Sequence, residues 1–145
     1  MKKKSHRSSI LQTKTVALLF EKPSLRTRVS FEVGIRHLSG DVITLTNEEV
    51  GLGKRESVED VARVLSRYVD MLVIRTFSHD FLKRLAAHAS MPVINALTDH
   101  SHPCQAIADA ITIKENLGKL ATHTVVYVGD ENNVSHSLSE LCQLT

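Results

Sequence analysis

Three short segments carry side chains that could bind a small anion and polarise a carbonyl group. Ser24-Leu-Arg-Thr-Arg28 combines hydroxyl and guanidinium groups, Arg75 follows an apolar run, and His102-Pro-Cys-Gln105 places an imidazole and an amide within one helical turn. Hydroxyls and free N–H groups at a helix start suit phosphate or carboxylate, and arginine adds bidentate contacts. For residues 24–28 alone, an N-cap serine followed by exposed arginines fits as well. Arg75 at another strand end favours an anion site.

Other chemistry has weaker support in the sequence. Asp99, His100 and His102 could form a metal cluster, but metal sites usually need three or four ligands with an ordered second shell, and no second cluster supplies them. Cys104 has no base beside it, which indicates a buried small residue rather than a nucleophile. Residues 129–133 stand where a dinucleotide fingerprint would, with a single glycine. The residues therefore favour neither a metal, nor a covalent mechanism, nor a nucleotide cofactor.

Strand and helix patterns alternate along the chain, and these elements must position the polar residues. Short apolar runs predict strands at 15–20, 41–46, 71–74, 92–97 and 124–128. Helical spacing of apolar residues predicts helices at 25–38, 57–69, 80–89, 102–117 and 134–144. This alternation predicts the α/β class, with a parallel sheet covered by helices on both faces. Because ligands bind beyond the carboxyl ends of such strands, the polar segments that follow each strand are the expected site.

Composition excludes several classes of protein. The 145 residues include 18 Lys and Arg against 16 Asp and Glu, and a net charge of +2 is too small to indicate nucleic-acid binding. No apolar run approaches the ~20 residues that span a bilayer. Two cysteines cannot form a disulfide framework, and a reducing, cytoplasmic compartment fits them. We interpret residues 1–13 as a solvated basic tail; a nucleic-acid arm and part of an organellar presequence are the alternatives.

Four motifs, in order, closely resemble the ornithine carbamoyltransferase family. They are residues 20–32, Arg75-Thr-Phe77, His102–Gln105 and Gly129-Asp-Glu-Asn-Asn133, within a match that runs from about Lys14 to the last residue. The resemblance implies carbamoyl transfer from carbamoyl phosphate to the δ-amine of L-ornithine, giving citrulline and phosphate without a cofactor or metal. It also implies a homotrimer, a carbamoyl phosphate-binding domain at 14–118 with a linking helix at 102–118, and the first strand and helix of an ornithine-binding domain at 119–145.

The same resemblance implies a role for each motif residue. The phosphate is expected to be held by Ser24, Leu25, Arg26 and Thr27. Arg75 is expected to bridge the phosphate and the carbonyl oxygen, and His102 to donate to that oxygen. The carbamoyl amide is expected at Gln105 and the backbone near Pro103 and Cys104, and ornithine at Asn133. Arg75, His102 and Thr27 are the expected catalytic residues, because preorganised donors stabilise the developing oxyanion.

Some family features differ in this sequence. The family's N-terminal helix and later ornithine-binding segments have no counterpart, so we expect little or no turnover by residues 1–145 alone. Gly51 stands where many members have a Gln that reaches a neighbouring subunit, so either Lys54 or backbone groups substitute or the contact is lost; Glu131 replaces a common Gly. Two other functions stay open: a non-catalytic anion-binding module, and a sister transcarbamylase that uses putrescine, an acylated ornithine or aspartate.

Overall fold

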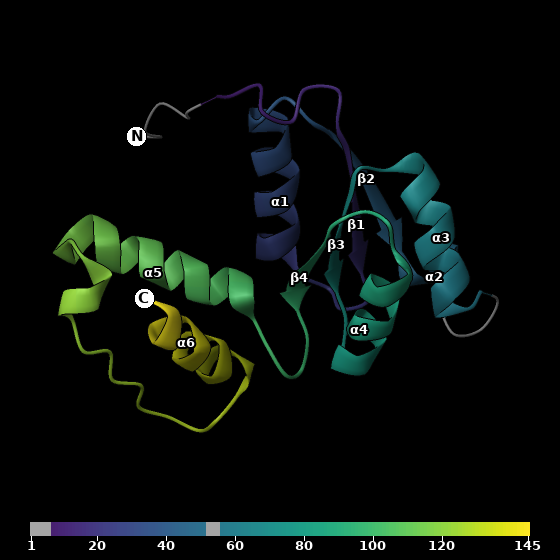
Figure 1. Ribbon diagram of the computed structural model, residues 1–145. Helices are drawn as coiled ribbons and strands as arrows, with labels where there is room; N and C mark the ends of the chain where they lie inside the picture. The colour runs from purple at the N-terminus through teal and green to yellow at the C-terminus, as the bar shows by residue number, and fades with distance from the viewer. Residues whose placement is uncertain (1–6, 52–55) are drawn as a thin grey trace.

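A four-stranded parallel sheet forms the centre of the computed structural model, which describes residues 7–51 and 56–145. Its strands are β1 (Thr15–Phe20), β2 (Asp41–Thr46), β3 (Met71–Arg75) and β4 (Val93–Leu97), in the order β2-β1-β3-β4. All three pairings are parallel. The predicted α/β class is confirmed (Figure 1).

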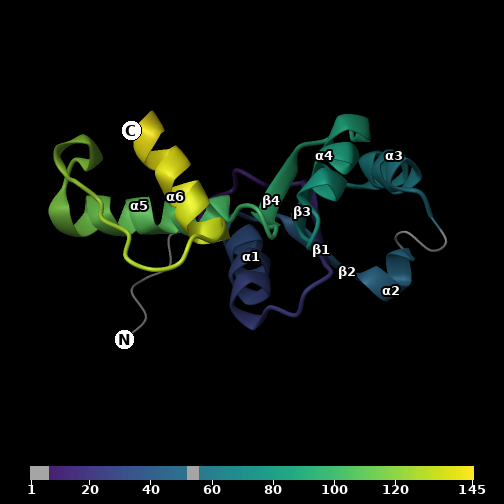
Figure 2. The ribbon, with the colours of Figure 1, turned by 90° about the horizontal axis from the view of Figure 1, so that it is seen from below.

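Helices cover both faces of the sheet, as the alternation predicts. On one face, α3 (Val58–Tyr68) and α4 (His79–His88) pack against alternate residues of β1 and β3. On the other face, α1 (Leu25–His37) packs through Ile35. Figures 1 and 2 show α1 separated from α3 and α4 by the sheet. This packing buries the middle of the sheet, where Leu18 of β1 is fully inaccessible to solvent.

Beyond β4 the chain leaves the sheet. It forms α5 (Pro103–Leu117), a 3₁₀ turn at Leu120–Thr122 and α6 (Asn133–Leu144), and α6 packs against α5 (Figures 1 and 2). The predicted strand at 124–128 is wrong for the described structure. The segment has no strand partner there, and Val126 and Val128 are 77% and 91% exposed. β-branched residues supply strand propensity, but a strand forms only where a neighbour pairs its backbone groups.

One α-helix was not predicted, and each end of the predicted elements that form differs by at most one residue. A single turn, α2 (Asn47–Val50), follows β2 directly. Thr46 and Glu49 form a capping box around its start, and Gly51 ends it with a φ of 64° in the left-handed region, where glycine is unstrained. The helix α3 also has a cap, since the Ser57 hydroxyl accepts the N–H of Asp60 at 3.1 Å.

The described part of the predicted basic tail packs against the end of α1. Ser8 and Leu11 donate backbone N–H groups to the carbonyls of His37 and Leu38, each at 2.9 Å. Leu11 also packs against the cluster that contains Ile35. The first six residues lie outside the described part of the chain. Among the described residues, no helix combines the length and the apolar character needed to cross a membrane.

Candidate functional site

The order of the strands reverses at β1, and the predicted site residues gather at this point. β1 pairs with β2 on one side and with β3 on the other. Phe20 and Arg75 are register partners at the carboxyl ends of β1 and β3, and the Glu21 N–H donates to the Arg75 carbonyl at 2.9 Å. Open parallel sheets bind ligands at such a reversal, because the loops on either side diverge and leave a crevice.

The backbone around Arg75 is fixed from both sides. The pairing of β3 with β4 shifts register between Ile74 and Arg75, an irregularity that redirects a side chain. Immediately beyond, Thr76 is 1% exposed and donates its hydroxyl to the Glu21 carboxylate, which also accepts the N–H of Phe77 at 3.4 Å. These contacts join the two strand ends, so the position of Arg75 depends on packing and not on a mobile loop.

The start of α1 offers several hydrogen-bond donors to the same crevice. Ser24 is its N-cap residue, with extended backbone angles and no cap hydrogen bond from its side chain. The first turn has no acidic residue, so nothing neutralises the positive end of the helix. Leu25 is 80% exposed, so its backbone N–H, rather than its side chain, is the group that could meet an anion. The geometry suits an anion at Ser24–Thr27.

Arg75 connects this helix start to the sheet. One of its terminal nitrogens donates to the Thr27 hydroxyl at 3.3 Å. Its Nε is buried and has no hydrogen-bond partner within the described residues. Burial lowers the pKa of the Arg75 guanidinium, which nevertheless stays charged at neutral pH. The chain therefore holds a cationic fork in place, and its buried Nε–H is unused within the described residues.

His102 lies on the opposite side of the crevice, at the start of α5. Its backbone N–H donates to two acceptors in α6, the Asn133 carbonyl at 3.2 Å and the Ser137 hydroxyl at 2.9 Å. Its ring Nδ1 is buried and lacks a partner among the described residues. Burial, and then the positive charge of Arg75, lower the pKa of the His102 imidazole below its ordinary value, so the ring is mainly neutral at pH 7.

The remaining motif residues differ in how they face the crevice. Gln105 is exposed and donates its amide N–H to Asp109 at 2.9 Å, and its carbonyl oxygen has no hydrogen bond to the described residues. The Cys104 thiol is half-buried, contacts the Asn95 carbonyl at 3.4 Å, and has its pKa raised by burial. A protonated thiol is a poor nucleophile, which agrees with the expected structural role. Asn133 donates its amide to the Thr98 carbonyl at 2.7 Å.

These residues line one cavity of about 680 Å³ between α1, the ends of β3 and β4, α5 and α6. Its lining includes the predicted residues Ser24, Leu25, Arg26, Thr27, Arg75, His102, Cys104, Gln105 and Asn133. Pro103 is outside the lining and occupies the first position of α5, where a missing N–H costs little. The structure thus brings together side chains from four separate parts of the sequence.

Sequence reasoning missed part of the lining. Pro23, Ser30, Phe31, Leu97, Ala108 and Val134 also face the cavity. Ser30 and Phe31 lie one helical turn beyond Arg26 and Thr27, and that spacing was the available signal. Lys22 lies just before this lining; its ammonium pairs with Asp99 and lies 4.0 Å from the centre of the Phe77 ring.

The structure arranges Asp99 and His100 differently from a metal cluster. Asp99 pairs with Lys22, and the His100 ring stands between the rings of His79 and His136, with centroid separations of 4.8 and 5.3 Å. No group of three His, Cys, Asp or Glu within residues 7–51 and 56–145 is arranged to hold a metal ion. Lys54, considered as a substitute at the Gly51 position, lies outside the described residues.

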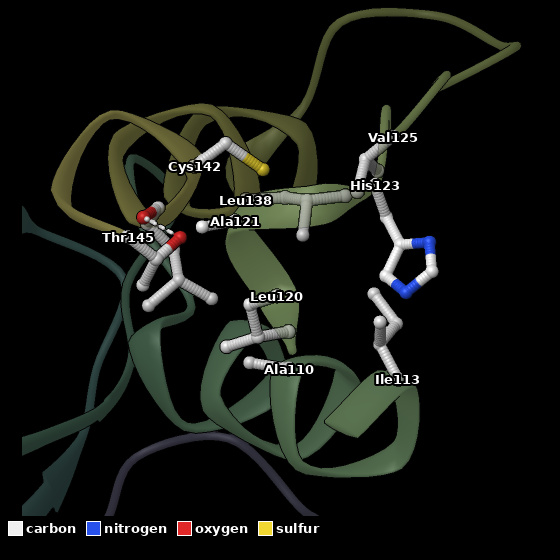
Figure 3. A pocket seen from close by; sticks show the side chains of 10 residues that line it. Ala110, Ile113, Leu120, Ala121, His123, Val125, Leu138, Cys142 and Thr145 are labelled. Carbon is white, nitrogen blue, oxygen red and sulfur yellow. Dashed lines mark hydrogen bonds between the residues drawn. The ribbon is translucent and has the colours of Figure 1, made fainter. Parts of the chain in front are cut away.

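A second cavity, of about 240 Å³, lies between α5 and α6 (Figure 3). Apolar side chains such as Ile113 and Leu138 dominate its lining. Two polar side chains of this lining already form hydrogen bonds with the backbone. The His123 ring contacts the Leu117 carbonyl at 3.0 Å, and the Thr145 hydroxyl donates to the Leu141 carbonyl at 3.1 Å. It lacks the convergent donors of the crevice at β1 and β3, which is therefore the candidate site.

Stability should fall below neutral pH because of His102 and His79. Burial lowers the pKa of both rings, so between those lowered values and ~6.5 the unfolded chain binds more protons than the folded one. The free energy of unfolding should therefore be retained above pH ~6.5, decrease as pH falls from ~6.5 towards the lowered pKa values, and level off below them. Urea unfolding of wild type and His102→Gln from pH 7.5 to 5 tests this. The variant should show a smaller decrease, and replacing the exposed His88 with Gln should change little. An identical decrease in His102→Gln would contradict the assignment.

The arrangement agrees with what known proteins resemble this chain. Residues 1–115 match the family described as aspartate/ornithine carbamoyltransferase, carbamoyl-P binding domain. Ornithine carbamoyltransferase of Mesorhizobium japonicum is 52% identical over 138 residues, which cover 95% of this chain and 46% of that protein. The corresponding protein of a Parafrankia species is 56% identical over 128 residues, 88% of this chain and 40% of its own length.

Solved structures agree. The crystal structure of ornithine carbamoyltransferase from Thermus thermophilus superimposes with a TM-score of 0.90 at 50% identity, over 96% of this chain and 48% of that one. The chain thus spans less than half the length of each of these relatives. The family match covers most of the chain and includes the cavity residues on α1, β3, β4 and the first turns of α5. The chain belongs to the aspartate/ornithine carbamoyltransferase family.

Proposed function

We propose that this chain forms the carbamoyl phosphate-binding part of an ornithine carbamoyltransferase. In this assignment residues 14–118 are the carbamoyl phosphate-binding domain, α5 is its linking helix, and residues 119–145 begin the ornithine-binding domain. The family match over residues 1–115 and the names of the relatives support it. The reaction would transfer the carbamoyl group to the δ-amine of L-ornithine and yield citrulline and phosphate.

The observation that carries the proposal is a pair of buried polar atoms that lack partners. Arg75 Nε and His102 Nδ1 have no hydrogen-bond partner among the described residues, and both side chains line the cavity that begins at Ser24. An unsatisfied buried polar atom costs about 1–3 kcal/mol. A ligand with acceptor oxygens in this cavity would recover part of that cost, which favours a phosphate-bearing ligand that also has a carbonyl group.

At the phosphate end, the start of α1 supplies donors without an opposing carboxylate. The Ser24 and Thr27 hydroxyls, the free N–H groups of the first turn and the Arg26 guanidinium all line the cavity. Such groups favour the dianionic leaving group more strongly as negative charge builds up on it. Arg75, in contact with Thr27, would reach both the phosphate and the carbonyl oxygen.

At the carbonyl end, the neutral δ-amine would attack the carbonyl carbon, and a C–N bond would form. The carbonyl oxygen gains negative charge at that step, and Arg75 and His102 would donate to it. The C–O bond to phosphate then breaks, phosphate leaves with the electron pair, and the amine nitrogen gives up one proton, which the departing phosphate can accept. A neutral His102 ring offers one N–H donor, and the pKa shifts of His102 and Cys104 agree with polar catalysis rather than a covalent thiol intermediate.

Gln105 and Asn133 would complete ligand recognition. The free carbonyl oxygen of Gln105 would accept the amide N–H groups of the carbamoyl group. Asn133 already donates one N–H to the Thr98 carbonyl, so its Oδ1 is the acceptor left for an amine ligand. Oxygen and nitrogen positions of an amide follow from such hydrogen-bond partners.

Calorimetric titration of residues 1–145 with fresh carbamoyl phosphate tests the proposal directly. We expect saturable binding at one site, competition by inorganic phosphate, and little or no citrulline after ornithine is added to the chain alone. Absence of binding to the folded chain would overturn the assignment. Robust citrulline formation would keep the family assignment and overturn the expectation of low turnover.

A non-catalytic carbamoyl phosphate-binding module is the second candidate function. It is favoured by one observation: Asn133, the predicted ornithine contact in this chain, already donates one amide N–H to the Thr98 carbonyl, so only part of its side chain is left for an amine ligand. The two candidates separate when the remaining half of a relative is added as a second polypeptide. Citrulline formation by the mixture supports the enzyme, and carbamoyl phosphate binding without citrulline supports the module. Putrescine, N-acetylornithine and aspartate in place of ornithine would test the sister activities.

The resemblance also implies a homotrimer of the full-length protein, and the two cysteines fit a reducing, cytoplasmic compartment. Light scattering during size-exclusion chromatography would test the assembly, because three copies of the 16.1 kDa chain give a distinct mass. Localisation of a tagged gene product in the native cell would test the compartment.

A further inference from the structure

A buried serine on α6 contacts the backbone of the candidate catalytic histidine. Ser137 is 3% exposed, and its hydroxyl accepts the backbone N–H of His102 at 2.9 Å. The same N–H lies 3.2 Å from the Asn133 carbonyl, one turn earlier on α6. Figures 1 and 2 show the start of α6 beside the loop that enters α5. α6 therefore supplies both acceptors for an N–H group that lies outside the hydrogen-bonded ladder of α5.

The backbone of His102 needs such a support. His102 is the N-cap residue of α5, with φ −135° and ψ 66°, outside both the helical and the usual strand regions. Its side-chain direction therefore depends on contacts from outside α5. Without the Ser137 hydroxyl, its N–H keeps only the longer contact to Asn133, and the ring that carries the buried Nδ1 is less firmly held.

The loop before His102 is anchored to the same helix. Thr98 and Ser101 close the loop on each other, with the Thr98 N–H donating to the Ser101 carbonyl at 2.8 Å. The Asn133 amide then donates to the Thr98 carbonyl at 2.7 Å. On the other side, the His79 ring contacts the Thr98 hydroxyl at 3.0 Å. With the rest of the loop fixed, the Ser137 contact acts on the last residue before α5.

We propose that Ser137 is a positioning residue for the carbamoyl group. It holds the His102 backbone so that the imidazole meets the carbonyl oxygen, a role that rests on the proposed function. Ser137 does not line the cavity, and within the described part of the chain it forms no hydrogen bond with Arg26 or Arg75, the groups assigned to the phosphate end. Loss of its hydroxyl should therefore weaken the contacts to the carbonyl end of the ligand and leave the contacts to the phosphate end unchanged.

Titration of residues 1–145 with two ligands tests this split. In Ser137→Ala we expect about tenfold weaker binding of carbamoyl phosphate, which corresponds to one lost ordinary hydrogen bond, and inorganic phosphate affinity within about twofold of wild type. Ser139→Ala is the matched control, because Ser139 lies two residues along the same helix and is exposed. Both affinities should be unchanged in that control.

Each contrary outcome is distinct. Equal carbamoyl phosphate affinity in wild type and Ser137→Ala would overturn the positioning role and leave the proposed function standing. An equal loss of affinity for carbamoyl phosphate and for inorganic phosphate would also overturn it, because a general structural effect does not discriminate between the two ligands. Failure of folded wild type to bind either ligand would overturn the proposed function and this role with it.

A second substitution covers the case in which Ser137→Ala does not fold. Ser137→Cys preserves the approximate shape of the side chain and replaces the hydroxyl by a weak acceptor. It should show the same selective loss of carbamoyl phosphate affinity. Unchanged affinity in the folded Cys variant would overturn the proposal.

Discussion

Arg26→Ala is expected to remove measurable binding of both carbamoyl phosphate and inorganic phosphate, a loss of about 100-fold or more, while the fold stays intact. Arg26 is exposed on the first turn of α1 and lines the candidate cavity. A guanidinium forms charge-assisted, often bidentate bonds to phosphate, worth about 1.5–3 kcal/mol for each bond to a charged group. No other side chain on that turn carries a positive charge into the cavity, because Arg28 pairs with Glu32 at 3.1 Å.

Arg36→Ala is the matched control for this prediction. Arg36 lies on the last turn of the same helix, 3.8 Å from Glu32, and is not part of the cavity lining. Isothermal titration should give wild-type affinity for this control, and urea unfolding should give similar midpoints for both arginine variants, since exposed substitutions usually change stability by less than about 0.5 kcal/mol. Retained phosphate binding in Arg26→Ala would remove the start of α1 from the site.

The central strand β1 shows how much of the fold could be predicted from the sequence. The run Thr15–Phe20 is short, apolar and bounded by polar residues, and it lies in the middle of the sheet with partners on both sides. The sequence pattern predicts such a strand because a strand buried on both faces needs an unbroken run of apolar residues. The strand order β2-β1-β3-β4 could not be predicted in this way. It depends on which strand pairs with which, and the composition of one strand does not encode that choice.

Local sequence signals can miss an element that forms and can predict one that does not. Residues 46–49 contain the Thr-x-x-Glu spacing of a capping box, and yet α2 was not predicted, because a single turn has no apolar periodicity to detect. Residues 124–128 have a strong strand composition, and yet they form no strand and are exposed in the described structure. Strand propensity is a property of one segment, whereas a strand forms only where a neighbouring strand pairs with its backbone.

The site was easier to predict than the contacts that support it. Ser24, Arg75 and His102 could be grouped from sequence alone, because residues that follow parallel strands meet at one edge of the sheet. The Glu21 contact to Thr76 and the Ser137 contact to His102 could not be found in this way, since each joins residues 35 or more positions apart through one specific side-chain orientation. Such contacts depend on the packed structure, and there they determine how rigidly the site is held.

Leu18→Ala should produce the largest loss of stability in the chain, about 3–5 kcal/mol. Leu18 is fully buried at the centre of β1, between register partners on β2 and β3, and a cavity there cannot be filled by surface rearrangement. Domains typically have a free energy of unfolding of about 5–15 kcal/mol, so the variant loses a large share of it. Urea unfolding followed by circular dichroism measures the loss. Leu117→Ala, the same substitution at a residue 63% exposed at the end of α5, should cost under about 0.5 kcal/mol.

Ligand addition to Leu18→Ala connects this loss to the site. The substitution lowers the population of the native state without touching the cavity lining, so a ligand that binds only the native state should stabilise variant and wild type equally. Inorganic phosphate at 100 times its dissociation constant should add about 2.7 kcal/mol to each. Arg26→Ala at the same phosphate concentration should gain almost nothing. Equal gains in all three proteins would place the phosphate away from Arg26, and no gain in wild type would show that the folded chain does not bind phosphate.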